Sequence, residues 1–182
     1  IVVGSFIFTI GGVDWLIPLG LFFVLSSLLS KLGKKRKQAL QKIVIKGGRR
    51  DISQVYANGG VGLVLALAYH FFPHPIFYLM FLGSLAAANA DTWETEIGTF
   101  FQKTTYSIVN FKKVPPGTSG GVSILGTLGG IAGAVIIAIS VVFLLPNQPG
   151  FLLFFTVIIS GFLGSLIDSY TGALFQAEYT CP

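Results

Sequence analysis

Residues 151–159 have the sequence FLLFFTVII, an apolar run without the alternation of apolar and polar side chains that a membrane β-barrel strand requires. A segment surrounded by lipid must satisfy its backbone hydrogen bonds internally, so it forms either a helix or part of a closed barrel. The run therefore predicts a transmembrane helix, which we expect to cover residues 151–176.

The composition extends this prediction to the whole chain. Its 182 residues are 53% hydrophobic and 10% charged, with a mean hydropathy of +0.78. A soluble domain carries about 25% charged residues, so this chain cannot cover a water-facing surface. One span needs about 20 residues, so the length allows roughly five or six helices. We expect one all-α domain, a polytopic transmembrane bundle covering residues 1–182.

Apolar runs that end at charged or turn-rich breaks predict about six spans. The first is expected to be partial, because the chain opens without Met inside an apolar run. Trp15 suits the membrane–water boundary at the start of the second span. The expected spans are residues 1–10, 15–32, 52–72, 76–99, 119–145 and 151–176.

All twelve Lys and Arg lie in two predicted loops, residues 31–50 and 100–118. Six alternating spans put both loops on one side of the membrane, and the positive-inside rule makes that side cytoplasmic. The net charge of +5 thus reflects topology, and no nucleic-acid partner is expected. The single Cys181 excludes an intramolecular disulfide.

Carboxylates gather toward the same side. Gly83, Ala87, Ala90, Asp91 and Glu94 form one helical stripe, which small residues allow to pack closely inside the bundle. An ionisable group within a span costs at least ~2.5 kcal/mol to insert, which makes such groups candidates for a functional site. The stripe therefore predicts that Asp91 and Glu94 face the bundle interior as metal ligands. A solvated interfacial charge remains the alternative for Glu94.

Glu96 lies about 140° around the helix from Asp91. The two can address one site only if the helix ends or unwinds near Trp93, and a solvated charge is again the alternative for Glu96. Asp168 follows a second stripe of small residues, which is expected to leave it no room to be a surface charge. A structural pairing with Arg49 or Arg50 is the alternative for Asp168.

The predicted fifth span begins with a Gly-rich stretch after a Pro-Pro-Gly turn. Unpaired N–H groups at a helix start, where glycine allows close approach, form an anion site. The residues expected to bind phosphate there are Thr118, Ser119, Gly120, Gly121 and Ser123. The alternative is a plain N-cap with packing through Gly126, Gly130 and Gly133.

Two arginines and an asparagine begin the predicted third span. Arg49 and Arg50 are suited to phosphate, and lipid headgroup contact is the alternative. Asn58 precedes two glycines, which indicates a kink or a close backbone approach. Carboxylates beside anion donors favour Mg²⁺ bridging a polyphosphate, an arrangement that serves phosphoryl transfer. His70 and His74 lie near the opposite end of that span and are excluded as bases.

Four motifs together resemble the phytyl-phosphate kinase family of integral membrane proteins, which includes transmembrane-protein-19-like sequences. They are RDxxQVxANGG (50–60), ANADTWxxEIG (88–98), GTSGGVS (117–123) and GFxGSxxDS (161–169). The family is distantly similar to dolichol kinases and phosphatidate cytidylyltransferases. Its members usually continue into a further Asn-Asp-containing helix, whereas this sequence stops at Cys181-Pro182, so a site completed in that helix would be incomplete here.

The resemblance implies a kinase that uses a nucleoside triphosphate, typically CTP, to convert a prenyl monophosphate into the diphosphate. It implies that Asp91, Glu96 and Asp168 are catalytic metal or nucleotide-phosphate ligands, with Asn58 and Ser169 among the phosphate contacts. The expected cofactor is Mg²⁺ and the expected environment is a lipid bilayer; homodimerisation is left open. A cytidylyltransferase that releases pyrophosphate and a transporter with Asp91 and Asp168 as ion ligands are the alternatives.

Overall fold

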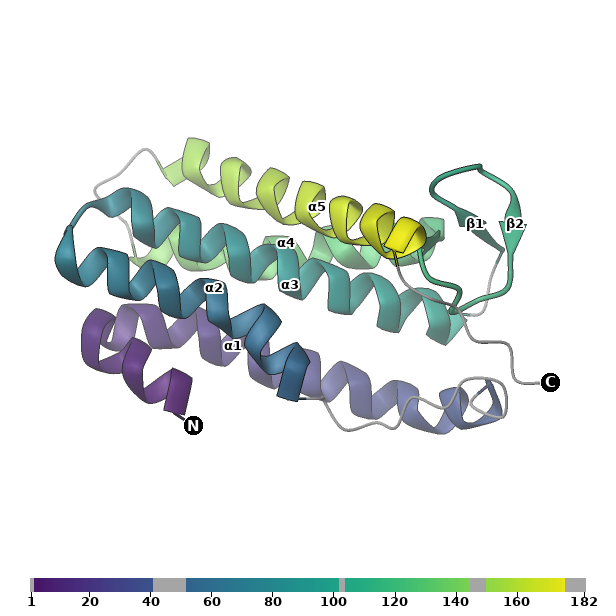
Figure 1. The fold of residues 1–182 in the computed structure, drawn as a ribbon, viewed down its shortest axis with the longest axis horizontal. Coiled ribbons are helices and arrows are strands. Elements are labelled where there is room, and N and C mark those ends of the chain that lie inside the picture. The colour runs from purple at the N-terminus through teal and green to yellow at the C-terminus, as the bar shows by residue number, and fades with distance from the viewer. Residues whose placement is uncertain (1, 41–51, 102–103, 145–149, 176–182) are drawn as a thin grey trace.

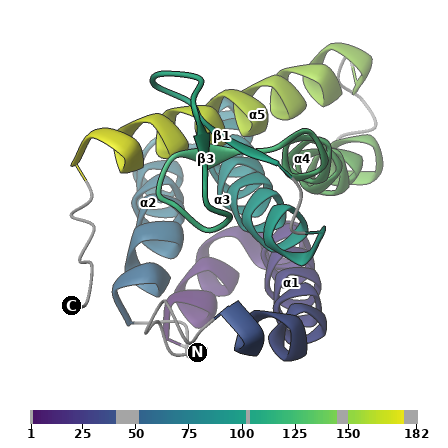
Figure 2. The same ribbon diagram turned by 90° about the vertical axis from the view of Figure 1, so that its right-hand side faces the viewer.

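The computed structural model describes residues 2–40, 52–101, 104–144 and 150–175, and it leaves out the side chains of residues 2, 33–40 and 52–58 (Figure 1). The described residues form five helices and one small sheet. The helices are α1 (Val2–Leu40), α2 (Ile52–Phe71), α3 (Pro75–Phe101), α4 (Ile124–Leu144) and α5 (Gly150–Phe175). Viewed from the end that carries the sheet, the helices surround α3 (Figure 2).

Helix α1 is two helical arms joined at a sharp turn. Gly12 has a φ of 67° and a ψ of −157°, a backbone conformation that glycine adopts without steric cost. Figure 1 shows the first arm in dark purple turning back along the second. The prediction that the first apolar run ends at Gly11-Gly12 is therefore confirmed, and the two arms with α2 to α5 correspond to the six predicted segments.

The bundle has the apolar length that a membrane requires. Val3–Leu32 in α1, Ile124–Leu144 and Gly150–Phe175 are each long and apolar enough to cross a bilayer, and Gly59–Phe71 is a shorter apolar segment. Helix α3 is not among them, and it carries three acids in its second half. The predicted class, an all-α membrane bundle, is confirmed, although among the described residues fewer segments meet the length and composition of a full span than the six predicted.

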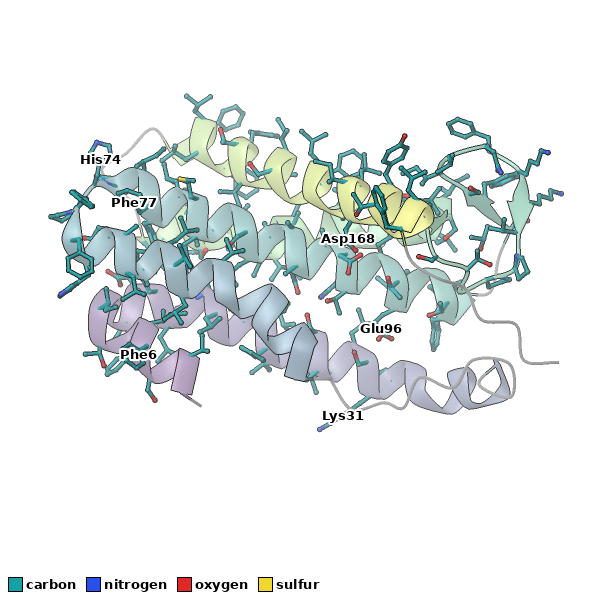
Figure 3. The ribbon with its side chains drawn as sticks, viewed as in Figure 1. Phe6, Lys31, His74, Phe77, Glu96 and Asp168 are labelled. Carbon is teal, nitrogen blue, oxygen red and sulfur yellow. The ribbon has the colours of Figure 1, made fainter. Side chains whose placement is uncertain are left out.

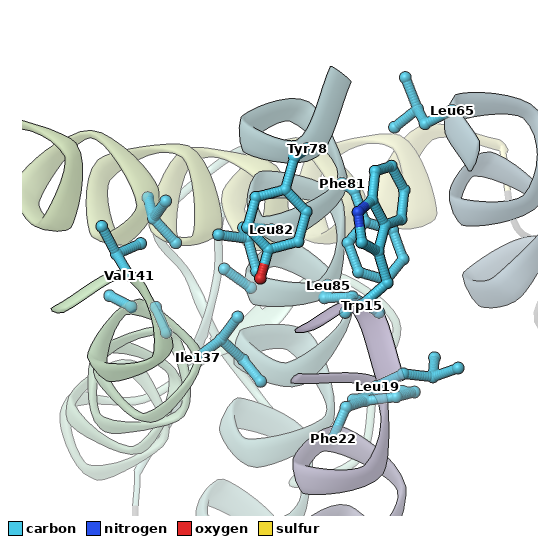
Figure 4. Close-up of a cluster of buried hydrophobic side chains, with 14 of the residues drawn as sticks. Trp15, Leu19, Phe22, Leu65, Tyr78, Phe81, Leu82, Leu85, Ile137 and Val141 are labelled. Atoms are coloured by element: carbon cyan, nitrogen blue, oxygen red, sulfur yellow. The ribbon is translucent and has the colours of Figure 1, made fainter. Parts of the chain in front are cut away.

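Helix α3 is the centre of the bundle, because each of the other four helices packs against it. Its fully buried residues include Phe81, Leu82 and Leu85, which meet Ile137 and Val141 of α4 in one apolar core (Figure 4). A helix buried on several sides presents every face to a neighbour, so the direction of each polar side chain on α3 is set by which helix it meets.

An aromatic cluster closes the end of the bundle opposite the acids of α3. The Trp15 ring centroid lies 4.6 Å from that of Phe81, 5.1 Å from Tyr78 and 5.3 Å from Tyr69. The Tyr78 hydroxyl donates to the Asp14 backbone carbonyl at 2.9 Å. Trp15 is 3% exposed, so its ring packs between helices and does not face the surroundings of the bundle; its predicted level at the membrane–water boundary stays a prediction.

Both predicted loops contain regular structure. Residues 31–40 continue α1, because Leu, Lys, Arg, Gln and Ala in this stretch are good helix formers. After Phe101 the chain forms β1 (Thr105–Ser107), β2 (Lys113–Val114) and β3 (Gly121–Val122), an antiparallel sheet in the order β2-β1-β3. Gly121–Val122 is thus a strand and α4 begins at Ile124, five residues later than the predicted start of that span.

Candidate functional site

The α3–α5 contact is built from small residues. A Cβ added at Gly164 would lie 2.4 Å from the Ala87 Cβ, and one added at Gly161 would lie 2.9 Å from the Ala86 Cβ. Gly83 likewise approaches Ser160, at 3.5 Å. The predicted stripes of α3 and α5 therefore face each other, which brings the acids at their ends together.

Asp91 and Asp168 meet across this contact. The two carboxyl groups lie close enough for their charges to interact, and Glu94 adds a third negative group near Asp91. Asp168 nevertheless remains exposed, so the expectation that it has no room to be a surface charge is wrong. The two carboxylates repel each other when both are ionised, and a cation placed between them would remove that repulsion.

Glu94 lies where α3, α4 and α5 meet. Its side chain is 6% exposed; Oε1 accepts a hydrogen bond from the Thr127 hydroxyl at 3.4 Å, and the Ser165 hydroxyl also lies within reach. Among the described residues, Oε2 is buried without a hydrogen-bond partner. A Cβ added at Gly130 would stand 3.5 Å from that oxygen, so glycine is what lets α4 approach here. Glu94 is therefore an interior group and not a solvated interfacial charge.

Glu96 belongs to a different contact. Helix α3 continues without a break to Phe101, so the unwinding near Trp93 that would bring Glu96 to Asp91 does not occur. Glu96 is 9% exposed and its Oε1 accepts a hydrogen bond from Ser30 of α1 at 2.9 Å. The predicted grouping of Glu96 with Asp91 in one ligand set is therefore corrected: the carboxylates lie on different sides of α3.

Asn89 is a polar residue whose role the sequence did not predict. It is fully buried; its Oδ1 accepts a hydrogen bond from Ser26 of α1, and its Nδ2 donates to the Gly133 carbonyl of α4, each at 2.8 Å. These bonds hold three helices together one half-turn before Asp91. Because residues two apart point in nearly opposite directions on a helix, fixing Asn89 toward α1 and α4 directs Asp91 toward α5.

The Gly-rich stretch forms a turn and a strand instead of the predicted helix start. Thr118 donates its hydroxyl to the Pro115 carbonyl at 2.8 Å, and the Gly121 N–H donates to the Thr118 carbonyl at 3.0 Å. Ser123 caps α4, since its hydroxyl accepts a hydrogen bond from the Gly126 N–H at 3.1 Å. The N-cap alternative therefore holds for Ser123, and the N–H groups of Thr118 and Gly121 already donate to backbone carbonyls.

Packing along α4 also follows that alternative. A Cβ added at Gly126 would lie 2.9 Å from the Glu94 carbonyl oxygen, and one added at Gly133 would lie 3.0 Å from the Asn89 carbonyl oxygen. The glycine face of α4 thus lies directly on the stretch of α3 that carries the acids.

Gly120 nevertheless brings the turn to α5. It has a φ of 68°, and a Cβ there would lie 2.3 Å from the Ala173 Cβ and 2.8 Å from the Ser169 carbonyl oxygen. The turn therefore packs beside Ser169, the residue that follows Asp168. Of the predicted phosphate contacts, the turn from Thr118 to Gly121 and Ser169 are brought together.

Other predicted contacts cannot be compared. Arg49 and Arg50 lie outside the described residues, and Asn58 lies in α2 without a described side chain. Among the described residues, no three His, Cys, Asp or Glu side chains are arranged to hold a metal ion. What the α3–α5 contact offers is a pair of facing carboxylates, at the end of the bundle that also carries Glu96 (Figure 3).

The exposed lysines lie toward this same end. Lys31 projects from the second arm of α1, and Lys112 and Lys113 stand at the sheet. His74 lies at the far end of the bundle (Figure 3), and Tyr78, four residues later at the start of α3, donates its hydroxyl to the Asp14 carbonyl there. The three lysines whose side chains are described therefore lie away from the end that carries Asp14.

Comparison with known proteins identifies the family. The family described as integral membrane protein DUF92 matches residues 1–182. An uncharacterized membrane protein of Methanocaldococcus jannaschii is 33% identical over 174 residues, which cover 92% of this chain and 67% of that protein. One of Synechocystis is 30% identical over 176 residues, covering 93% and 66%. The chain therefore spans about two thirds of the length of these relatives.

A plant relative covers a smaller part. Protein VTE6, chloroplastic, of Arabidopsis thaliana is 31% identical over 122 residues, which cover 64% of this chain and 37% of that protein. No solved structure matches the chain. The family match over the full sequence agrees with the resemblance of the four motifs and with the helical bundle, and the chain belongs to the DUF92 family of integral membrane proteins.

Proposed function

We propose that the chain forms the core of a membrane-embedded kinase that transfers a phosphoryl group from CTP, or another nucleoside triphosphate, to a prenyl monophosphate. The observation that carries the proposal is the pair of facing carboxylates, Asp91 and Asp168, joined by the packing of small residues between α3 and α5. The motifs that resemble the phytyl-phosphate kinase family supply the class of substrate.

The carboxylate pair fits Mg²⁺. This ion is usually held by one or two protein carboxylates, and water and substrate phosphates complete its oxygen shell. Asp91 and Asp168 would hold it, with Glu94 as a further candidate behind Asp91. When bound, Mg²⁺ would neutralise charge on the nucleotide phosphates. Two carboxylates are sufficient for such a site, so it does not require the third side chain that Glu96 was expected to supply.

Phosphoryl transfer requires mainly alignment and charge neutralisation. A terminal oxygen of the prenyl monophosphate would attack the γ-phosphorus, and the bond from that phosphorus to the β–γ bridging oxygen would break. The products are a prenyl diphosphate and a nucleoside diphosphate. The turn from Thr118 to Gly121, beside Ser169, is the phosphate contact we propose from the described residues; Arg49, Arg50 and Asn58 remain proposed contacts from the motifs.

The position of the acids supports an active site at the cytoplasmic face. Asp91 and Asp168 lie toward the end of the bundle that carries the exposed lysines, and the positive-inside rule makes such an end cytoplasmic. Nucleotides are available on that side. A lipid monophosphate would keep its tail beside the helices and its headgroup at the same level as the carboxylates.

A direct assay tests the proposal. The purified chain in lipid nanodiscs is incubated with Mg²⁺, γ-³²P-labelled CTP or ATP, and phytyl or geranylgeranyl monophosphate, and the lipid products are separated. The proposal predicts labelled lipid diphosphate, lost in Asp91→Asn and Asp168→Asn and retained in Asp14→Asn, whose acid lies at the opposite end. Pyrophosphate together with a CDP-lipid would instead establish the cytidylyltransferase. No product with any pairing, in the chain and in the longer relative of Methanocaldococcus jannaschii, would refute both.

A further inference from the structure

The loop that joins β1 and β2 presents apolar side chains outward. Residues 108–112 connect the strands, and both views show this loop projecting past α5 at the edge of the bundle (Figures 1 and 2). Phe111 is 77% exposed and Val109 is 42% exposed. A single exposed ring is ordinary on a protein surface, so the side chains that accompany it indicate what it contacts.

The backbone of this loop is held in place by hydrogen bonds. The Phe111 N–H donates to the Ser107 carbonyl, and the Ser107 N–H donates to the Lys112 carbonyl, each at 2.9 Å. The Lys112 N–H donates to the Asn110 Oδ1 at 3.0 Å. Phe111 has a φ of 54°, a left-handed conformation that is unfavourable for a bulky residue and persists only where the surroundings impose it. The outward position of Phe111 is therefore a feature of the folded loop.

The charges next to the ring define the partner. Lys112 and Lys113 are exposed directly after Phe111, and the sequence contains no acid between Glu96 and Asp168. Two adjacent exposed lysines attract anionic groups, and an exposed ring beside them matches the boundary between lipid headgroups and acyl chains. An acidic protein surface would pair with the lysines but not with the ring, and an apolar groove would accept the ring but not the lysines.

The level of the loop along the bundle agrees with this partner. Tyr106 of β1 and Tyr170 of α5 are both partly exposed at the same end, 40% and 48% respectively. Exposed tyrosines concentrate at the membrane–water interface, where the ring lies among apolar chains and the hydroxyl remains hydrated. The two tyrosines near the loop are therefore of the kind that is found at the level of the lipid headgroups.

We propose that the β1–β2 loop is an interfacial anchor: Val109 and Phe111 insert into the boundary of the surrounding leaflet, and Lys112 and Lys113 bind the headgroups of anionic lipids. The anchor would fix the sheet, and with it the Gly120 turn beside Ser169, at a constant depth relative to the bilayer surface. This proposal does not depend on the kinase activity.

Spin-label accessibility measures the depth of the loop directly. In a Cys181→Ser background, Phe111→Cys carries a nitroxide, and Val109→Cys carries it in a second protein so that the test survives if one variant misfolds. Both are placed in nanodiscs of phosphatidylcholine alone or with phosphatidylglycerol. Val24→Cys, 58% exposed on α1, supplies the reference for a lipid-facing position. Collision rates with oxygen, which partitions into lipid, and with a water-soluble nickel chelate are compared.

The anchor predicts that oxygen reaches both loop labels much more readily than nickel does, and that phosphatidylglycerol strengthens this preference. Lys112→Glu with Lys113→Glu should remove the effect of phosphatidylglycerol, since each lysine near an anionic surface shifts such an equilibrium by about fivefold. Lys31→Glu, compared with each single loop variant, makes the same charge change elsewhere and should leave the labels unaffected. Free access of nickel in both lipids, or exclusion of both reagents by covering protein, would overturn the proposal.

Discussion

The polar side chains on the two sides of α3 have different kinds of neighbours. Toward α1, Asn89 and Glu96 each accept a hydrogen bond from a serine hydroxyl, at 2.8 Å and 2.9 Å. Toward α5, Asp91 meets a second carboxylate, Asp168, with Glu94 close behind. Polar groups between membrane helices are satisfied by partners where they serve packing, whereas like charges brought together without a cation raise the energy of the fold. The proposed function therefore assigns helix packing to the polar groups on the α1 side and the cation to the carboxylates on the α5 side.

The largest effect is expected where like charges meet. Asp91→Asn and Asp168→Asn should each lower prenyl-phosphate kinase activity by more than ~100-fold, since even groups that only orient metal ligands are worth about 10–100-fold. The labelled-phosphate assay on purified protein measures this. Because the two residues would serve one ion, the double variant should be little worse than either single one. Near-full activity in either single variant would assign that residue to packing alone.

The next largest effect concerns the contact that brings the carboxylates together. Gly164→Ala places a methyl group where the Ala87 Cβ would be 2.4 Å away, so α5 must shift away from α3. Such overpacking costs about 1–3 kcal/mol, and activity should fall with it. Thermal unfolding in detergent measures the loss of stability. Gly20→Ala is the matched control, because a Cβ there meets nothing within 4 Å; equal losses in both variants would contradict the close packing.

On the structural side, Asn89→Ala removes two hydrogen bonds between helices. Bonds of this kind average about 0.6 kcal/mol in membrane proteins, so a loss of roughly 1–2 kcal/mol is expected, counting the carbonyl and hydroxyl left behind. Ser26→Ala should cost less. In a double-mutant cycle with equilibrium unfolding, the two substitutions should be less than additive. Strict additivity would mean that the bond between Ser26 and Asn89 contributes nothing.

The smallest expected loss of activity is for Glu96→Gln, and comparing it with Glu94→Gln distinguishes the α1 side of α3 from the α5 side. Glu96→Gln keeps an oxygen that can accept from Ser30, so activity should remain within about fivefold of the wild type, the equivalent of one hydrogen bond of roughly 1 kcal/mol. Glu94→Gln, beside the carboxylate pair, is the comparison and should lower activity further. If Glu96→Gln lowered activity more than Glu94→Gln does, the candidate site would lie on the α1 side.

Much of the fold could be predicted because lipid imposes simple rules. The charge-free runs, the turn at Gly11-Gly12 and the facing stripes of small residues all follow from the need to bury backbone and to pack closely. The stripe also predicted that Asp91 would face the bundle interior, where the structure places it beside Asp168 of α5. Helical periodicity tells which residues share one face of a helix. A stripe of small residues on that face then indicates that the face packs against another helix.

The sequence-based predictions were wrong where contacts with distant segments determine the local structure or the partner of a side chain. The Gly-rich stretch before α4 has no apolar period, and its pairing with Thr105–Ser107 as a strand depends on contacts across the loop. Glu96 and Asp91 share one motif string, but an unbroken helix separates their directions by about 140°. Asn89 could have been recognised as a buried amide in an apolar helix, although its partners, Ser26 and Gly133, come from distant segments.

The central claim is that Asp91 and Asp168, without Glu96, hold the divalent cation of the site. Manganese, which shares the oxygen preference of Mg²⁺ and is paramagnetic, allows bound and free ion to be counted by electron paramagnetic resonance in the presence of CTP. The account predicts one bound ion in the wild type and in Glu96→Gln, with affinity reduced by more than ~10-fold in Asp91→Asn and in Asp168→Asn. Unchanged binding in both aspartate variants, or loss in Glu96→Gln alone, would contradict it.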